Sequence, residues 1–408
     1  MKFFKHALFL FHALSFLLMP SSSPAGEINE LIIKAGQGHV ETQFKLGNAY
    51  YSGKGAEKNF EQAFFWHEKA AQQGHSKAQR ALGAMYEMGE GVTKKPEKAA
   101  YWYEKAAQQG LARAQTNLGI LYETGVGVAQ SYDTAHIWYE KAAAQGYARG
   151  QTYLGRMYEL GIGVAVDYTK ASYWYQKAAA QGYARAQTNI GALYEAGQGV
   201  EQNYAKAITW YTEAAENRYA RAQFYLGRMF EQGLGIGKDL VQASDWYSKA
   251  AKLGHVDAQF YLGLLYLKGE GVEKDLQKGM VWIQKAAENG NVYAQNNLGL
   301  LYLYGEGVEK DLQKGIFWLQ KAAENGNVYA QKNLGQMYYF EKDYLQAALW
   351  ISKAAMGGNA EAQNNLAFMY LKGIGFERNT ELAIYWLQKA ADQGNSNALE
   401  ALAKIIED

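Results

Sequence analysis

The chain has 408 residues, with 41 basic and 40 acidic side chains, no cysteine, and only three prolines beside 44 glycines. Its near-neutral charge argues against a nucleic-acid partner, because proteins that bind nucleic acid carry a positive patch or domain. Without cysteine, no disulfide can hold the fold together. The fold must therefore rest on a core built from the 49% of residues that are hydrophobic. Abundant glycine and scarce proline favour helices that end at glycine turns.

The first 25 residues are typical of a secretory signal peptide. Lys2 and Lys5 precede an apolar stretch over Ala7–Met19, and residues 23–25 supply small side chains for cleavage. The apolar stretch is too short to span a membrane, although a retained anchor is the alternative. Cleavage after residue 25 removes two of the 41 basic residues and none of the 40 acidic ones, which leaves a net charge of −1. No later stretch has transmembrane length, so we expect an exported protein of the periplasm or the extracellular medium.

Residues 26–38 are predicted to form an N-terminal capping helix, and a regular repeat follows it. Tryptophan and glutamine recur every 36 residues, except for one step of 32 between Trp318 and Trp350. The tryptophans are Trp66, Trp102, Trp138, Trp174, Trp210, Trp246, Trp282, Trp318, Trp350 and Trp386. The glutamines are Gln43, Gln79, Gln115, Gln151, Gln187, Gln223, Gln259, Gln295, Gln331 and Gln363. A fixed period of this length indicates a stacked repeat array.

One unit, residues 75–110, predicts a helix–turn–helix hairpin. Apolar residues recur at helical spacing in two segments, separated by the Gly-Glu-Gly sequence at 89–91. Pro96 opens the second segment, where its missing N–H is harmless, and Gly110 closes it. Trp102 lies on the apolar stripe of the second helix. We therefore expect a buried wedge between helices, whereas an aromatic platform for a sugar would need exposed indole rings.

The repeated glutamine is predicted to be a structural residue. Gln79 follows Ala78, the small residue that opens the first helix of its unit. Because buried amides must be hydrogen-bonded, we expect it to bond to the backbone at the junction between repeats. A row of glutamines that binds a ligand is the alternative.

Ten units cover residues 39–394, and residues 395–408 are predicted to form a C-terminal capping helix. The units begin at His39, His75, Leu111, Tyr147, Tyr183, Tyr219, His255, Asn291, Asn327 and Asn359. The ninth unit has lost its Gly-x-Gly turn, which should change the local pitch of the array; a neutral loop deletion is the alternative. In the fifth unit Arg218 replaces the closing glycine, and we expect Asn217 to adopt the left-handed conformation in its place.

The shared pattern resembles the Sel-one-like repeat, a longer relative of the tetratricopeptide repeat. The resemblance rests on Leu-Gly pairs such as Leu118-Gly119, the following tyrosine, the Gly-x-Gly turn, the tryptophan and the Lys-Ala-Ala-x-x-Gly ending. It implies an all-α fold: a right-handed α-solenoid superhelix of about ten helix–turn–helix repeats with half-repeat caps. It also implies a non-enzymatic scaffold, monomeric and without a cofactor, that binds a partner protein or peptide in a concave groove lined by the first helices.

Positions that vary on the first helices are the candidate contacts for such a partner. Positions are counted from the first residue of each unit. In units two to six, position 3 is basic and position 13 is acidic, a pattern that a solvated, mutually paired surface would explain. In units seven to ten these positions, with positions 10 and 14, become largely apolar. We predict that this apolar zone binds a partner, because exposed aromatic residues mark interaction sites, although some members could pack between repeats instead. The predicted residues are Leu264, Leu267, Tyr293, Leu300, Leu303, Tyr304, Tyr329, Tyr339, Phe340, Phe368 and Leu371.

No catalytic, cofactor or metal site emerges from the sequence. His67-Glu68 begins like a zinc-protease helix, but Ala71 stands where the second histidine is required. A glycine-rich stretch at 233–238 is followed by Asp239, where a phosphate-binding loop needs serine or threonine. Two alternatives to the scaffold remain. One is a secreted factor that contacts host proteins, and the other is a β-lactamase-like hydrolase, which cysteine-rich relatives suggest and the lack of cysteine disfavours.

Overall fold

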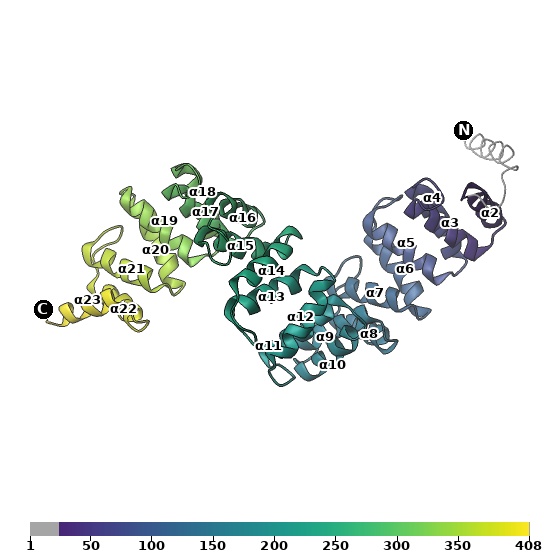
Figure 1. The fold of residues 1–408 in the computed structure, drawn as a ribbon, viewed down its shortest axis with the longest axis horizontal. Coiled ribbons are helices and arrows are strands. Elements are labelled where there is room, and N and C mark those ends of the chain that lie inside the picture. The colour runs from purple at the N-terminus through teal and green to yellow at the C-terminus, as the bar shows by residue number, and fades with distance from the viewer. Residues whose placement is uncertain (1–23, 408) are drawn as a thin grey trace. The chain divides into compact units, whose positions relative to one another are not determined.

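The computed structural model describes residues 24–407, and over this range it contains 22 α-helices and no strands (Figure 1). The predicted signal peptide falls almost entirely on residues 1–23, outside the described range. The first helices of the hairpins are α3 (Val40–Ser52), α5 (Ser76–Met88), α7 (Ala112–Thr124), α9 (Ala148–Leu160), α11 (Ala184–Ala196), α13 (Ala220–Gln232), α15 (Val256–Lys268), α17 (Val292–Tyr304), α19 (Val328–Phe340) and α21 (Ala360–Lys372). The second helices are α4 (Phe60–Gln72), α6 (Pro96–Gln108), α8 (Tyr132–Ala144), α10 (Tyr168–Ala179), α12 (Tyr204–Glu216), α14 (Leu240–Lys252), α16 (Leu276–Glu288), α18 (Leu312–Glu324), α20 (Tyr344–Met356) and α22 (Thr380–Ala391). At the two ends, α2 (Pro24–Gly36) packs on α3, and α23 (Ser396–Glu407) packs on α22.

The helices form consecutive hairpins that stack within two compact units, one up to Ala214 and one from Ala215 onward. In both units the two helices of a hairpin pack together, as α5 does with α6 and α15 with α16. The second helix then packs on the first helix of the next hairpin, as α6 does on α7. This arrangement confirms the predicted all-α fold of stacked hairpins.

The ends of the helices follow the sequence signals closely. Gly89 ends α5 with a φ of 81°, a conformation that glycine adopts without steric cost. Pro96 is the first residue of α6, as predicted. Other second helices begin at a side-chain cap, such as Asn59, whose Oδ1 accepts the N–H of Gln62 at 3.0 Å.

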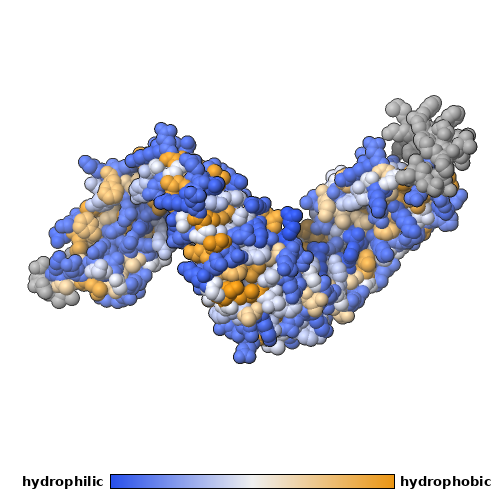
Figure 2. All heavy atoms as spheres, viewed as in Figure 1, coloured by the Kyte–Doolittle hydropathy of each residue, from blue (hydrophilic) through white to orange (hydrophobic). Residues whose placement is uncertain are grey.

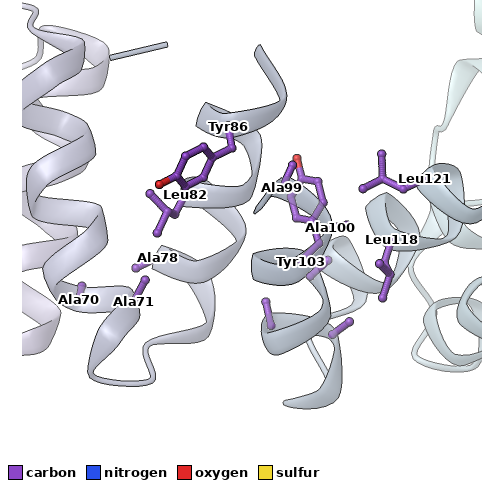
Figure 3. Packing of buried hydrophobic residues seen from close by; sticks show 13 residues of the cluster. Ala70, Ala71, Ala78, Leu82, Tyr86, Ala99, Ala100, Tyr103, Leu118 and Leu121 are labelled. Carbon is purple, nitrogen blue, oxygen red and sulfur yellow. The ribbon is translucent and has the colours of Figure 1, made fainter. Parts of the chain in front are cut away.

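Small residues bring the helices of a hairpin close together. A Cβ at Gly83 would lie 2.7 Å from the ring of Tyr103, so the glycine of the Leu-Gly pair makes room for the residue that faces it. Around this contact, alanines and leucines from successive helices form the core, with Leu82 and Tyr86 on one side and Leu118 and Leu121 on the other (Figure 3).

The prediction that tryptophan is the buried wedge is wrong. Nine of the ten tryptophans are half-buried, and only Trp350, in the shortened ninth repeat, is buried. The residue that fills the gap between the helices is the next one, at position 29, such as Tyr103, which is 1% exposed. The indole lies at the edge of the stripe, and in six repeats the lysine three residues later lies over it. Lys249 Nζ, for example, lies 3.8 Å from the ring centre of Trp246.

Two turns depart from the common pattern. Arg218 itself adopts the left-handed conformation, with a φ of 58°, so the prediction that Asn217 would adopt it is wrong. The turn after the helix requires a left-handed residue at the place where the other repeats have glycine, and Arg218 occupies that place. In the ninth repeat, α19 runs into a short turn in which Lys342 has a φ of 65°.

Within residues 24–407, none of the helices has both the length and the apolar character needed to cross a membrane.

Candidate interaction surfaces

The repeated glutamine is used inside the protein. In every repeat its Nε2 donates to a backbone carbonyl eight residues earlier, on the preceding helix, as Gln79 does to Ala71 at 3.2 Å. The same bond is formed by Gln43, Gln115, Gln151, Gln187, Gln223, Gln259, Gln295, Gln331 and Gln363. All ten side chains are buried. The prediction of a backbone bond at the junction between repeats is confirmed, and the amides are not a surface that could bind a ligand.

The acidic row at position 13 also has an internal partner. In repeats 2 to 6 the buried tyrosine at position 29 donates its hydroxyl to the glutamate at position 13 of the same repeat. The pairs are Tyr103–Glu87, Tyr139–Glu123, Tyr175–Glu159, Tyr211–Glu195 and Tyr247–Glu231, at 2.5–2.8 Å. Burial, together with the nearby carboxylate, raises the pKa of Tyr247 above its ordinary value. The glutamates therefore satisfy the buried tyrosine hydroxyl groups of their own repeats.

Six residues of the predicted apolar zone are half-buried and pack against the core. Leu267 lies where a Cβ at Gly279 would be, 2.6 Å from its Cδ2, and Leu303 stands in the same relation to Gly315. These leucines fill space between the two helices of their own hairpin. The half-buried members are Leu264, Leu267, Leu300, Leu303, Tyr339 and Leu371. For most of them, packing between helices is sufficient to explain the apolar side chain.

The other five residues of the zone are exposed, and two of them line a pocket. The exposed members are Tyr293, Tyr304, Tyr329, Phe340 and Phe368. Phe340 is 82% exposed, which is unusual for phenylalanine in a structured helix. On the face drawn in Figure 2, apolar residues lie among polar ones on the surface of the α15–α20 segment.

The pocket lies between α19 and α21, with α20 beneath it, and has a volume of about 300 Å³. Tyr339 and Phe340 line it from the end of α19, and Phe368 lines it from α21. The remaining lining residues, which the sequence pattern did not single out, are Gln336, Ile351, Asn365 and Met369. Apolar walls with a few amide groups are typical of sites that take an apolar side chain and fix its orientation.

Among the described residues, no group of three or more histidine, aspartate or glutamate side chains could hold a metal ion. His67 is buried at position 29 of the first repeat, where later repeats carry tyrosine, isoleucine or leucine. Its Nδ1 has no hydrogen-bond partner, and burial lowers its pKa to about 4. The histidine belongs to the core, where its ring lies 5.6 Å from that of Phe44 between ring centres.

Comparison with known proteins identifies the repeat. A model of the Sel1 repeat matches ten consecutive segments that together span residues 40–395, including one short segment at 328–359. The chain is similar to the crystal structure of a protective antigen present in uropathogenic Escherichia coli strains, which displays an SLR fold. The identity is 38%, over 93% of this chain and 82% of that chain, with a TM-score of 0.71. It is also similar to a Sel1 repeat protein from Oxalobacter formigenes, with 33% identity over 78% of this chain and 95% of that chain and a TM-score of 0.60. None of the curated proteins matches. The predicted ten repeats are confirmed.

Proposed function

Because the chain belongs to the Sel1 repeat family, we propose that it is a non-catalytic scaffold that docks a partner protein through the pocket between α19 and α21. Members of this family generally mediate protein–protein interactions. A stacked array offers a long, regular surface on which the irregular positions can carry specificity. Hydrolysis of a chromogenic β-lactam by the purified protein would contradict the non-catalytic part of this proposal.

The exposure of Phe340 beside the pocket is the observation that carries the proposal. An aromatic side chain that is 82% exposed adds nothing to the core, and its removal from water on binding would stabilise a complex by about 2 kcal/mol. Phe368 and Tyr339 border the same pocket, so one apolar side chain of a partner could contact all three. Aromatic residues around a central pocket are the usual composition of an interface hot spot.

A pair of matched variants tests the site. Phe340→Ala/Phe368→Ala removes two exposed rings from the pocket, whereas Leu345→Ala/Met356→Ala removes two exposed apolar side chains of α20 that do not line it. Each variant would be compared with the unmodified protein, with a photo-reactive amino acid at Gln336 in all three and expression in the native organism. We expect the pocket variant to lose a discrete cross-linked partner that the control variant retains. Equal cross-linking in both would contradict the pocket as the docking site.

Leucines of the zone are poor choices for this test. Leu303 packs into the space above Gly315, so its replacement would disturb the α17–α18 hairpin and could abolish binding indirectly. The two phenylalanines are exposed, and substitutions on the surface usually change stability by less than about 0.5 kcal/mol. Thermal unfolding of each variant would confirm that the scaffold is intact.

We propose further that the protein is exported and meets proteins of a host organism. The N-terminal 25 residues have the pattern of a signal peptide, and the similar protein of uropathogenic Escherichia coli is described as a protective antigen. Cell fractionation with N-terminal sequencing would test export. A mature chain that begins at Gly26, in the periplasm or the medium, is the expected result. A cytoplasmic protein that retains Lys2 and Lys5 would contradict it.

A further inference from the structure

Three arginines at position 3 of successive repeats stand at the N-termini of their helices, where a positive charge is unfavourable. Arg113, Arg149 and Arg185 are the second residues of α7, α9 and α11. None of these helices has an acidic residue in its first turn or a basic one in its last turn. A helix carries partial positive charge at its N-terminus, so a cation there is disfavoured. The stability of the individual helices therefore does not explain the arginines.

Tyr153 of α9 gathers the guanidinium groups. The guanidinium carbon of Arg149 lies 5.7 Å from the centre of its ring, and that of Arg185 lies 5.2 Å from it. Arg156 approaches the same ring at 5.0 Å. Cations over an aromatic ring are attracted to its face, so the ring holds these groups close to one another despite their mutual repulsion.

The nearby carboxylates are already engaged elsewhere. Glu123 pairs with Arg156 and accepts the hydroxyl of Tyr139. Arg149 and Arg185 form no ion pair within the described part of the chain. Arg149 donates to Asn117 Oδ1 at 3.4 Å, and Arg185 donates to the Tyr153 hydroxyl at 3.5 Å, so both bonds are long and go to neutral oxygens. Because a guanidinium has five N–H donors, most of the hydrogen-bonding capacity of both groups is available to a ligand.

A glycine specific to this repeat brings the helices together. Gly150 follows Arg149, at a position where the eight other repeats after the first have alanine. A Cβ at Gly150 would lie 2.7 Å from Ala142 Cβ and 3.2 Å from Thr116 Oγ1 of α7. Without that Cβ, α9 can approach α7, and Arg149 reaches Asn117 on α7.

We propose that this arginine surface, formed by Arg149 and Arg185 at Tyr153 and by Arg113 at the same position one repeat earlier, binds the side-chain carboxylates of an acidic peptide segment. Guanidinium groups bind carboxylates with paired hydrogen bonds, and the ring of Tyr153 restricts two of them in advance. The glutamates at the other ends of the same helices, such as Glu123 and Glu159, limit the length of the positive area. A short run of carboxylates fits between these limits, whereas a long polyanion would meet the glutamates. The site is independent of the pocket between α19 and α21.

Fluorescence anisotropy with a defined probe tests the proposal on the full mature chain. The probe is a short fluorescein-labelled peptide of alternating aspartate and glutamate, acetylated and amidated at its ends. We expect Arg149→Gln/Arg185→Gln to weaken binding about tenfold or more, because two charge-assisted contacts are lost. The control Lys94→Gln/Lys95→Gln removes the same charge from the exposed α5–α6 turn and should change the affinity less than about twofold. Arg113 is exposed, so Arg113→Gln should leave the fold intact. We expect this variant to bind the peptide more weakly while its circular dichroism spectrum stays unchanged.

Three results would overturn the assignment. One is that the unmodified chain does not bind the peptide. Another is equal weakening by the arginine and lysine variants, which would mean unspecific attraction. The third is tighter binding of a labelled oligothymidylate than of the peptide, which would replace the acidic peptide by nucleic acid. Loss of the pocket phenylalanines should leave peptide binding unchanged, so failure here and failure of the proposed docking site remain distinguishable.

Discussion

Repeats 2 to 6 and repeats 7 to 10 fill the same gap between their helices in different ways. In the earlier repeats a buried tyrosine at position 29 donates to a glutamate at position 13. In the later ones the equivalent residue, which follows the tryptophan, is isoleucine or leucine, and position 13 is leucine, or tyrosine in the ninth repeat. In repeats 7 and 8 the leucine also takes the space left by a glycine at position 25, as Leu267 does at Gly279. Positions 13, 25 and 29 therefore act together.

The comparison teaches why polarity changes along the first helices. A glutamate at position 13 is required wherever a tyrosine hydroxyl is buried beneath it, since an unsatisfied buried hydroxyl is costly. Where position 29 is aliphatic, this requirement is absent and position 13 is apolar as well. The acidic row and much of the apolar zone are thus consequences of one buried position. The residues that this rule does not explain, such as Phe340, Phe368 and Arg149, are the stronger candidates for binding.

The first repeat has neither the tyrosine–glutamate pair nor an aliphatic residue at position 29. Its His67 gives the largest predicted effect on stability. Burial, with Arg80 and His75 nearby, lowers the pKa of His67 from 6.5 to about 4. Between these values the unfolded chain binds more protons than the folded chain. The contribution of neutral His67 to the free energy of unfolding is therefore fully present above pH 6.5 and is lost as the pH falls toward 4. The loss amounts to about 3 kcal/mol at pH 4. His67→Leu, which copies repeats 8 and 10, should abolish it.

Hydrogen exchange of the α3 and α4 amides at pH 7 and pH 4 measures this local stability. Protection should fall with pH in the unmodified protein much more than in His67→Leu, after correction for the intrinsic exchange rates. The amides of α15 and α16 provide an internal reference in both proteins. An equal loss of protection in the variant would show that another group causes the pH dependence.

Removing the acceptor from a tyrosine–glutamate pair gives the next largest effect. Glu231→Leu leaves the Tyr247 hydroxyl buried without its partner at 2.6 Å, which should lower the free energy of unfolding by about 2 kcal/mol. Adding Tyr247→Phe removes the unsatisfied hydroxyl and should recover more than half of the loss. Glu231→Gln, which keeps an acceptor, serves as the control and should cost less than Glu231→Leu.

Urea unfolding of the three variants and of Tyr247→Phe completes a double-mutant cycle. The hydrogen bond predicts a coupling of about 1 kcal/mol or more between the two positions. Strictly additive losses would mean that the pair contributes only through packing.

Most of the fold could be predicted from the sequence, because the same pattern of helix and turn signals recurs in ten repeats. The turn at Gly89, the start at Pro96 and the backbone bond of Gln79 follow from local chemistry alone. The tryptophan could not be placed correctly, because helical spacing defines a stripe but not which of two adjacent residues faces the neighbouring helix. That choice depends on Gly83, whose missing Cβ admits the residue after the tryptophan.

The candidate sites were harder to predict than the fold. Burial of Leu267 and Leu303 depends on glycines twelve residues later, and joint variation of positions 13, 25 and 29 is the signal that could have shown it. Exposure of Phe340 and Phe368 agrees with the predicted apolar zone. The arginine cluster around Tyr153 depends on contacts between different repeats, so neither the basic row at position 3 nor Gly150 showed in the sequence which side chains would meet.

The smallest predicted effect concerns the packing of Leu267 into the space at Gly279. A Cβ introduced by Gly279→Ala would lie 2.6 Å from Leu267 Cδ2 and 3.1 Å from the Gly263 carbonyl oxygen. Alanine is favoured over glycine within a helix by about 1 kcal/mol, whereas overpacking costs about 1–3 kcal/mol, so we expect a net loss of about 1 kcal/mol. In a Leu267→Ala background the clash with the leucine is absent, and the same substitution should stabilise the protein. Thermal unfolding of the four proteins measures this change of sign. If Gly279→Ala stabilised both backgrounds, the glycine would not be the counterpart of the leucine, and the coupling of positions 13 and 25 would have to be abandoned.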